Sequence, residues 1–386
     1  MSLPAVLVDL RAFDANAESL ARSVSSRRPE MKIRIATKSF RVPALIRRAL
    51  DASPVYQGLM CYAAEEIPFL ASQGFDDFLL AYPTLQPVAL RALADCAREK
   101  KISVVADSPE GIDALAQAAR ESGSKIGCVL ELDVSRRLSF AHPLGARRSP
   151  LQSSAHVKAL VNKIILSPEL KFEGIMAYES QVAGVQDLSP FKNCFVNLVT
   201  RWVRGLEARA VARRRQKVLE ELEQDGVRCR IVNGGGSGSL SFALSEERLT
   251  EVAAGSALLA PHLFSAYSNL KVDPALFVAL EVVRSSEEGW VTCAGGGYVA
   301  SGAHGMDRLL QAVYPEGSLL SPLEGCGEVQ TPVNIASTIL PALGTPLFFR
   351  PAKAGEPAER FKTYQLWDGK ELQEVPTYRG MGVCFL

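Results

Sequence analysis

Lys38 occupies a position where proteins of alternating strands and helices place reactive groups. It follows a short apolar run at residues 33–36 that is typical of a β-strand, and Pro43 then begins a stretch with the apolar spacing of a helix. In such folds functional side chains lie at the carboxyl ends of the strands. A lysine there can act as a nucleophile toward a carbonyl carbon. A solvated lysine in a surface loop is the alternative.

A glycine-rich segment follows a later strand-like run, with the sequence Asn233-Gly234-Gly235-Gly236-Ser237-Gly238-Ser239, and the pair Gly255-Ser256 follows the next run. Consecutive glycines let backbone N–H groups approach an anion, and the serine hydroxyls add donors. The spacing differs from that of nucleotide P-loops and of dinucleotide-binding folds. Because the loops after strands seven and eight of a barrel often bind phosphate, the two segments predict a phosphate site. A purely structural glycine-rich turn is the alternative.

The elements that must position these residues alternate regularly. Nine strand-like apolar runs, with helical patterns between them, lie between residues 5 and 253. Strict alternation predicts parallel strands joined by right-handed crossovers. Eight such units, from residue 33 onward, have the size of a (β/α)8 barrel. The first run, residues 5–10, is one too many for the barrel, and a doubly wound open sheet is the competing architecture.

The pattern changes after about residue 268. Short apolar runs are separated there by Gly, Pro, Asp and Ser, and Asp368-Gly369 marks a β-hairpin. We therefore predict an α/β protein in which a (β/α)8 TIM barrel at residues 11–267 is followed by a C-terminal all-β domain. This β-domain, residues 268–386, also takes up the N-terminal strand, residues 1–10.

The composition is that of an ordinary globular enzyme. The 386 residues are 47% hydrophobic and 22% charged, and the net charge of +1 gives no general attraction to nucleic acid or to an anionic membrane. No apolar run approaches the roughly 20 residues that a membrane span needs. The basic run 213–217 is expected to be a solvated helix face. Eight scattered cysteines without a CxxC pair and no evident signal peptide predict a cytoplasmic protein with reduced thiols.

Several motifs spread along the chain are shared with a known family. The sequence resembles the pyridoxal-phosphate enzymes of the alanine-racemase type (fold type III), which combine a barrel with a β-domain. It is most similar to the D-threonine aldolase and D-serine dehydratase branch. The resemblance covers nearly the whole chain and depends on these segments: Leu7-Val8-Asp9-Leu10, Ala36-Thr37-Lys38, Leu80-Ala81-Tyr82-Pro83, Ala106-Asp107-Ser108-Pro109, Gly174-Ile175-Met176-Ala177-Tyr178-Glu179, Asn233-Gly234-Gly235-Gly236-Ser237-Gly238 and Ala254-Gly255-Ser256.

The resemblance implies a role for individual residues. Lys38 would form a Schiff base with pyridoxal 5'-phosphate and move a proton at the substrate Cα. Arg148 would contact the phenolic oxygen of the cofactor, and Tyr178 would lie near its ring face. A surface arginine and a packing tyrosine are the respective alternatives. The phosphate would be held by Gly235, Gly236, Ser237, Gly255 and Ser256.

The sequence departs from the family at two places in the β-domain. The aldolase and dehydratase branch binds a divalent metal there through His-x-Cys or His-x-Asp ligands, but residues 350–356 contain neither histidine nor cysteine. The four histidines, at positions 142, 156, 262 and 304, are isolated, so we predict no metal ligands. Racemases of this type use a β-domain tyrosine as a second base, and Tyr298 is the candidate here, with core packing as the alternative. They also carry an arginine where this chain has Ala253, which weakens the racemase hypothesis.

Three functions remain open from the sequence. The first is a pyridoxal-phosphate lyase acting at Cα of a small D-amino acid, as an aldolase or a dehydratase. The second is an amino acid (alanine) racemase that uses Lys38 and Tyr298. The third is a pyridoxal-phosphate carrier without turnover. For the enzymes, the resemblance also implies a homodimer and an amino acid substrate.

Overall fold

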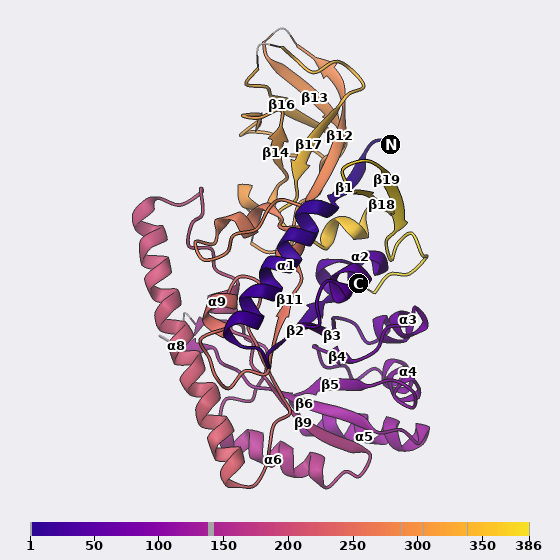
Figure 1. Ribbon diagram of the computed structural model, residues 1–386, viewed down its shortest axis with the longest axis vertical. Helices are drawn as coiled ribbons and strands as arrows, with labels where there is room; N and C mark the ends of the chain where they lie inside the picture. Colours follow the sequence, from indigo (N-terminus) through magenta and orange to yellow (C-terminus); the bar gives the residue numbers. More distant parts are fainter. Residues whose placement is uncertain (1, 138–142, 287, 304, 338, 386) are drawn as a thin grey trace.

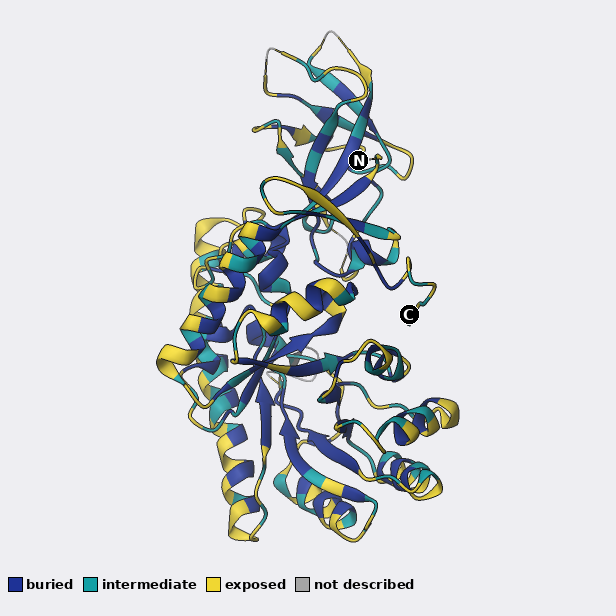
Figure 2. Ribbon diagram, turned by 45° about the vertical axis from the view of Figure 1, so that its right-hand side comes forward, coloured by how far each residue is buried: buried dark blue, intermediate teal, exposed yellow. Residues whose placement is uncertain are grey.

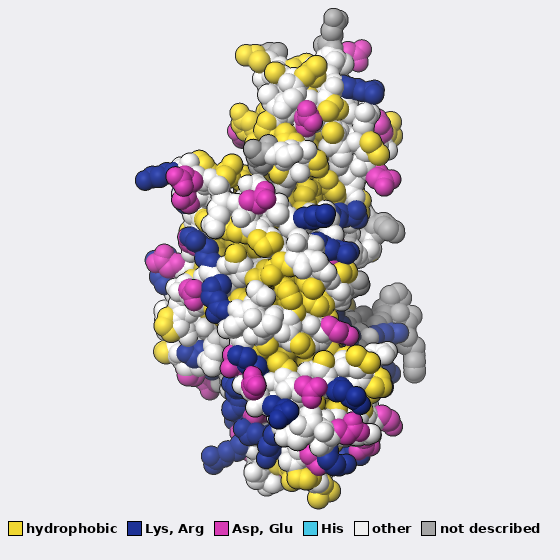
Figure 3. All heavy atoms as spheres, turned by 90° about the vertical axis from the view of Figure 1, so that its right-hand side faces the viewer, with side chains coloured by type: hydrophobic (Ala, Val, Ile, Leu, Met, Phe, Trp, Pro, Cys, Tyr) yellow, Lys and Arg dark blue, Asp and Glu magenta, His cyan; other side chains and the backbone are white. Residues whose placement is uncertain are grey.

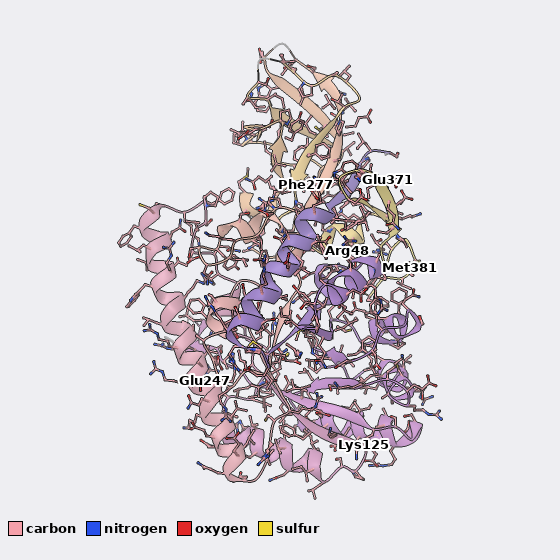
Figure 4. All side chains as sticks on the ribbon, viewed as in Figure 1. Arg48, Lys125, Glu247, Phe277, Glu371 and Met381 are labelled. Carbon is pink, nitrogen blue, oxygen red and sulfur yellow. The ribbon has the colours of Figure 1, made fainter. Side chains whose placement is uncertain are left out.

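The structure is a computed structural model that describes residues 2–137, 143–286, 288–303, 305–337 and 339–385. A barrel with its surrounding helices forms the lower part of the molecule, and a separate β-sheet forms the upper part (Figure 1). Lys125, just before the barrel strand β6, and Phe277, in the sheet strand β12, are labelled in these two parts (Figure 4). The predicted combination of a barrel with a β-domain is confirmed.

The barrel is closed and its eight strands are parallel. The alternative of a doubly wound open sheet is therefore wrong. Most residues of these strands are buried, as their dark colour in Figure 2 shows. In barrel order the strands are β10 (Ile231–Gly234), β11 (Glu251–Ala254), β2 (Lys32–Ala36), β3 (Tyr56–Cys61), β4 (Phe78–Leu80), β5 (Ile102–Ala106), β6 (Ile126–Glu131) and β9 (Leu170–Met176).

The helices bury one face each against the barrel, as their apolar spacing predicts. In α5 (Pro109–Ser122) the buried residues are Ile112, Leu115, Ala116 and Ala119, and the hydroxyl of Ser108 caps the first turn by accepting from the Gly111 N–H. The other helices are α1 (Leu10–Arg27), α2 (Pro43–Asp51), α3 (Glu66–Ser72), α4 (Pro87–Cys96), α6 (Ser154–Ile165), α7 (Ser180–Ala183), α8 (Cys194–Gln224), α9 (Leu240–Ala243) and α10 (Ser256–Leu259).

The N-terminal strand β1 (Ala5–Asp9) belongs to the second sheet, as predicted. It pairs antiparallel with β12 (Leu276–Ser285) and parallel with β18 (Thr363–Trp367). The expected hairpin at Asp368-Gly369 joins β18 to β19 (Leu372–Pro376). The remaining strands of this nine-stranded sheet are β13 (Trp290–Ala294), β14 (Gln311–Tyr314), β15 (Leu319–Leu320), β16 (Gln330–Asn334) and β17 (Pro346–Arg350). The domain boundaries at residues 10/11 and 267/268 stay a prediction.

A buried ionic network lies inside the barrel near the amino ends of β2, β4 and β11. Arg34 donates from Nε and Nη2 to the carboxylate of Glu251 at 2.8 and 2.9 Å, and from Nη1 to Asp77 at 3.0 Å. Asn233 also donates to Glu251, at 2.8 Å. Every charge in this layer therefore has an opposite charge beside it.

The surface agrees with the near-neutral composition. On the face drawn in Figure 3, basic and acidic side chains are intermingled over the barrel part. None of the helices in the described part of the chain combines the length and apolar character needed to cross a membrane.

Candidate active site

A cavity lies at the carboxyl ends of the barrel strands. Its walls come from loops after strands on opposite sides of the barrel. They include eight of the nine predicted site residues, namely Lys38, Arg148, Tyr178, Gly235, Gly236, Ser237, Gly255 and Ser256.

Lys38 lies in a short 3-10 turn, Thr37–Ser39, directly after β2. The hydroxyl of Thr37 donates to the Met60 carbonyl at 3.0 Å, and the hydroxyls of Ser39 and Ser256 are 2.9 Å apart. The backbone of Gly355 packs so closely that a Cβ there would lie 1.8 Å from the Lys38 carbonyl oxygen. The turn is therefore fixed on several sides, and the lysine side chain remains at the cavity wall.

The Lys38 amine donates a hydrogen bond to the Tyr82 hydroxyl at 3.1 Å. Tyr82 follows β4 and belongs to a segment shared with the family, Leu80-Ala81-Tyr82-Pro83, but the sequence analysis gives it no role. Within the described ranges, Lys38 forms no ion pair with a carboxylate. The hydrogen bond to Tyr82 could not be predicted, because it depends on where two side chains from different strands converge.

Arg148 lies beside two tyrosines of the cavity. Its guanidinium is 5.8 Å from the ring centroid of Tyr82 and 5.9 Å from that of Tyr178. Burial opposes ionisation of Tyr82, but the Lys38 ammonium, its hydrogen bond and the Arg148 guanidinium lower the pKa of Tyr82 below its ordinary value. Burial, followed by the charge of Glu179, raises the pKa of Tyr178 well above its ordinary value.

Hydrogen bonds to neighbouring side chains fix the conformation of the glycine-rich loop. The N–H of Gly235, whose φ is +74°, donates to Glu179 at 3.0 Å, and the N–H of Gly236 donates to the Ser239 hydroxyl at 3.0 Å. Among the hydrogen bonds of the described residues, none uses the backbone N–H groups of Ser237, Gly238 or Ser256, which all line the cavity. Three donors on one wall, with no partner among the described residues, fit a phosphate group.

Arg215 is a supporting residue that the sequence analysis misplaced. It is only 1% exposed, donates to the Ala177 carbonyl at 2.8 Å and pairs with Glu179 at 3.0 Å. Because Glu179 accepts the hydrogen bond from the Gly235 N–H, Arg215 stabilises the glycine-rich loop through Glu179. The expectation that residues 213–217 form a solvated face is therefore wrong for Arg215, since the 31-residue helix α8 turns this side chain inward.

Tyr298 is the one predicted site residue that does not reach the barrel cavity of its own chain. Its ring packs edge-on against Phe361 at 5.2 Å, and the guanidinium of Arg360 lies 5.8 Å from its centroid. It lines a different cavity between the β-domain and the loop of Arg41.

The segment expected to carry metal ligands in the related branch does not fit a divalent cation. Arg350 donates to the Ala260 carbonyl at 2.7 Å and to the Ser265 hydroxyl at 2.8 Å, and burial lowers its pKa to about 10. Ala352 is buried in an apolar cluster. In the part of the chain that the structure describes, no three His, Cys, Asp or Glu side chains come together as a metal site. His142 and His304 lie outside the described residues.

Comparison with known proteins identifies the family. The model of the alanine racemase N-terminal domain matches residues 8–261, so the chain belongs to this family. The match begins in β1 and ends after α10, and it therefore spans the whole barrel.

Individual relatives are more distant. A D-threonine aldolase of Arthrobacter sp is 27% identical over 254 residues, which are 66% of this chain and 60% of that protein. A 3-hydroxy-D-aspartate aldolase of Paracoccus denitrificans (strain Pd 1222) is 24% identical over 52% of this chain and 46% of its own length. The matched part thus spans less than two thirds of these curated relatives. The crystal structure of D-threonine aldolase from Filomicrobium marinum superposes with a TM-score of 0.84 at 20% identity, covering 99% of this chain and 97% of that one, which confirms the fold.

Proposed function

We propose that this chain is a pyridoxal-phosphate-dependent lyase that acts at Cα of a small D-amino acid carrying a β-hydroxyl group, as an aldolase or a dehydratase. The observation that carries the proposal is the convergence, on one cavity, of Lys38 and the N–H groups of Ser237, Gly238 and Ser256, which have no partner among the described residues. The names of the relatives, both aldolases of β-hydroxy D-amino acids, support the substrate class.

The residues present fit pyridoxal 5'-phosphate. Lys38 supplies the amine for covalent attachment, and the N–H groups of Ser237, Gly238 and Ser256 would hold the phosphate, on a loop shaped by Gly235, Gly236 and Gly255. Arg148 is the cation for the phenolic oxygen, and Tyr178 would pack near the ring. When bound, the cofactor supplies an electron sink for the bond broken at Cα.

The protein's own part is to position groups and move protons. Lys38 lines the cavity and would take and return a proton at Cα of the substrate. The guanidinium of Arg148 lies beside the rings of Tyr82 and Tyr178 and provides a positive charge at the cavity.

A homodimer belongs to the same proposal. Helix α8 exposes large apolar side chains along one face, with Phe195 70%, Leu198 61% and Trp202 66% exposed. Their spacing of three and four residues makes one continuous stripe. A stripe of this kind is usually covered by a protein partner, and a second copy of the chain would cover it on both subunits at once.

Two features of the described residues count against a racemase. Tyr298, the candidate second base, lines a different cavity from Lys38, and Ala253 lines the barrel cavity where a racemase has an arginine. A carrier without turnover would not require Tyr82 and Arg148 beside the lysine.

A panel of D- and L-amino acids offered to the cofactor-loaded protein tests the proposal. Glycine with acetaldehyde from D-threonine indicates the aldolase, and pyruvate with ammonia from D-serine indicates the dehydratase. Loss of optical activity without cleavage would replace the lyase by a racemase. If no amino acid of the panel reacts although the cofactor is bound, a carrier without turnover would be the better assignment.

A further inference from the structure

We propose that Tyr82 is the residue that moves the proton at the β-oxygen of the substrate, a task for which this chain needs no divalent metal. The inference rests on the proposed function, because it assumes a substrate with a β-hydroxyl group. Neither the sequence motifs nor the names of the relatives assign any role to Tyr82.

The hydroxyl of Tyr82 lies beside Nζ of Lys38, the nitrogen proposed to react. The residue lines the barrel cavity and is only partly exposed, and its hydroxyl accepts from the Lys38 amine at 3.1 Å. A group that removes or returns a β-oxygen proton must lie close to the lysine that serves Cα, because the two carbons are adjacent. Tyr82 meets this requirement.

The charges around Tyr82 come from several elements and mostly favour its ionised form. Lys38 approaches from the turn after β2 and Arg148 from the loop after β6, and both cations lie within 6 Å of the ring centroid, at 5.7 and 5.8 Å. Glu131, at the end of β6, opposes them, and burial raises the pKa of Glu131 to about 7, so its opposition is weaker below that pH. The balance lowers the pKa of Tyr82 despite its burial.

Tyr178 provides an internal contrast. It lies at nearly the same distance from Arg148, 5.9 Å, but has no hydrogen bond to Lys38 within the described residues and is next to Glu179. Burial raises its pKa, whereas the pKa of Tyr82 is lowered. Of the two tyrosines beside Arg148, only Tyr82 combines a hydrogen bond to Lys38 with a lowered pKa.

In both lyase reactions Tyr82 and Lys38 end with the protons they started with. In cleavage, the Tyr82 phenolate takes the proton of the β-hydroxyl, and the O–H electron pair forms the carbonyl bond of the aldehyde. The Cα–Cβ bond breaks, and its electron pair stays at Cα. Cα is then protonated from Lys38, and Tyr82 returns its proton to Lys38. In dehydration, Lys38 removes the Cα proton, the Tyr82 phenol donates its proton to the leaving hydroxyl, and water departs. Lys38 then passes its proton to the Tyr82 phenolate.

Residues 350–352 of the β-domain offer no acid or base for this task. In the segment where the related branch has metal ligands, Arg350 is bonded to Ala260 and Ser265 and Ala352 is packed in an apolar cluster. A guanidinium at this place would repel a divalent cation. Proton transfer at the β-oxygen therefore falls to a side chain of the barrel mouth.

The variant Tyr82→Phe tests the inference in the full-length, cofactor-loaded protein. We expect its yellow colour, and the exchange of the Cα proton of glycine with deuterium from the solvent, to stay within about threefold of wild type. Cleavage or dehydration of the β-hydroxy substrate should fall by about 10²- to 10⁴-fold, the usual worth of a general acid or base. We also expect a chelator to leave the lyase activity of the wild-type protein unchanged.

A second measurement does not depend on turnover. Titration of the cofactor-free wild-type protein, followed by the ultraviolet absorbance of phenolate, should reveal one tyrosine that ionises below the others. This step should be missing in Tyr82→Phe and unchanged in Tyr314→Phe, which removes a 62% exposed tyrosine of the β-domain.

The outcomes separate this inference from the proposed function. If wild type cleaves its substrate and Tyr82→Phe cleaves it equally well, only the role of Tyr82 is overturned. Loss of activity with a chelator and its recovery with Mn²⁺ would also overturn it. If wild type exchanges the Cα proton of glycine but neither cleaves nor dehydrates any β-hydroxy amino acid, the proposed function itself fails, and this role fails with it.

Discussion

The two ends of the barrel interior treat charge in opposite ways. Near the amino ends of the strands, Arg34 is paired with both Glu251 and Asp77, and each group in the network has a counter-charge within 3.0 Å. At the carboxyl ends, the cations Lys38 and Arg148 face tyrosine side chains instead. Removing one member of a buried pair leaves the other charge uncompensated, whereas Lys38 and Arg148, beside tyrosine rings, can meet an incoming anion or carbonyl group.

The comparison indicates where function lies in this fold. Removing a member of the paired layer should cost stability and leave the chemistry of the folded protein unchanged. Removing Lys38 or Arg148, at the carboxyl ends of the strands, should reduce activity and leave the stability of the protein nearly unchanged. The following substitutions test this difference.

Lys38→Ala should have the largest effect. With the amine lost, we expect covalent attachment of pyridoxal phosphate and all turnover to disappear, while the free energy of unfolding changes little. Lys125→Ala, at an exposed position just before β6, is the matched control and should retain colour and activity. Activity in Lys38→Ala comparable to that of the control would remove Lys38 from the mechanism.

Arg34→Met should have the largest effect on stability. It leaves Glu251 and Asp77 buried without their cation, and breaking such a pair typically costs about 3–5 kcal/mol. Arg48→Met breaks a pair with Asp14 that is nearly half exposed, and we expect less than about 1 kcal/mol. Denaturant unfolding measures both variants. Equal losses in the two would show that burial of the pair does not matter.

Glu131→Gln should change how stability depends on pH. Burial raises the pKa of Glu131 from 4.5 to about 7, so the folded state binds more protons than the unfolded state between these values. Stability therefore falls as the pH rises through this window and stays reduced above it. The substitution should raise the free energy of unfolding at pH 8 by up to about 3 kcal/mol and leave it unchanged near pH 4. The exposed Glu99→Gln should produce no such pH dependence.

Gly255→Ala should have a smaller effect, limited to the cavity. The added Cβ would lie 2.8 Å from the Ser39 Cβ and 2.9 Å from the Ala36 carbonyl oxygen, so one wall must shift. We expect the dissociation constant of pyridoxal phosphate to rise about tenfold, or about 1.4 kcal/mol. In Gly205→Ala, on helix α8, the new Cβ meets no atom within 4 Å and should leave cofactor binding unchanged. Equal affinity in the two variants would exclude a steric role for Gly255.

The sequence predicted the barrel and much of the cavity for a physical reason. Buried parallel strands are short apolar runs, and their carboxyl ends must meet at one face of a closed barrel. Lys38 and Gly235 could therefore be placed together without knowledge of any side-chain contact. The roles of the site residues stay predictions.

Other features depended on packing that no local pattern contains. The burial of Arg215 follows from how a 31-residue helix turns against the barrel, and the basic run around it predicted the opposite. The hydrogen bond between Lys38 and Tyr82 joins the turn after β2 to the loop after β4, and the two residues are 44 positions apart in the sequence. The separate cavity of Tyr298 depends on how the β-domain packs on the loop of Arg41.

We expect the aldehyde of pyridoxal phosphate to attach covalently to Lys38, in the cavity that also contains the two glycine-serine loops proposed to hold its phosphate. Reduction of the pyridoxal-phosphate-loaded protein with borohydride, followed by peptide mass mapping, locates the attached group. A single phosphopyridoxyl group should be found, on Lys38. A label on another lysine, or a protein that binds no pyridoxal phosphate at all, would overturn the assignment of Lys38.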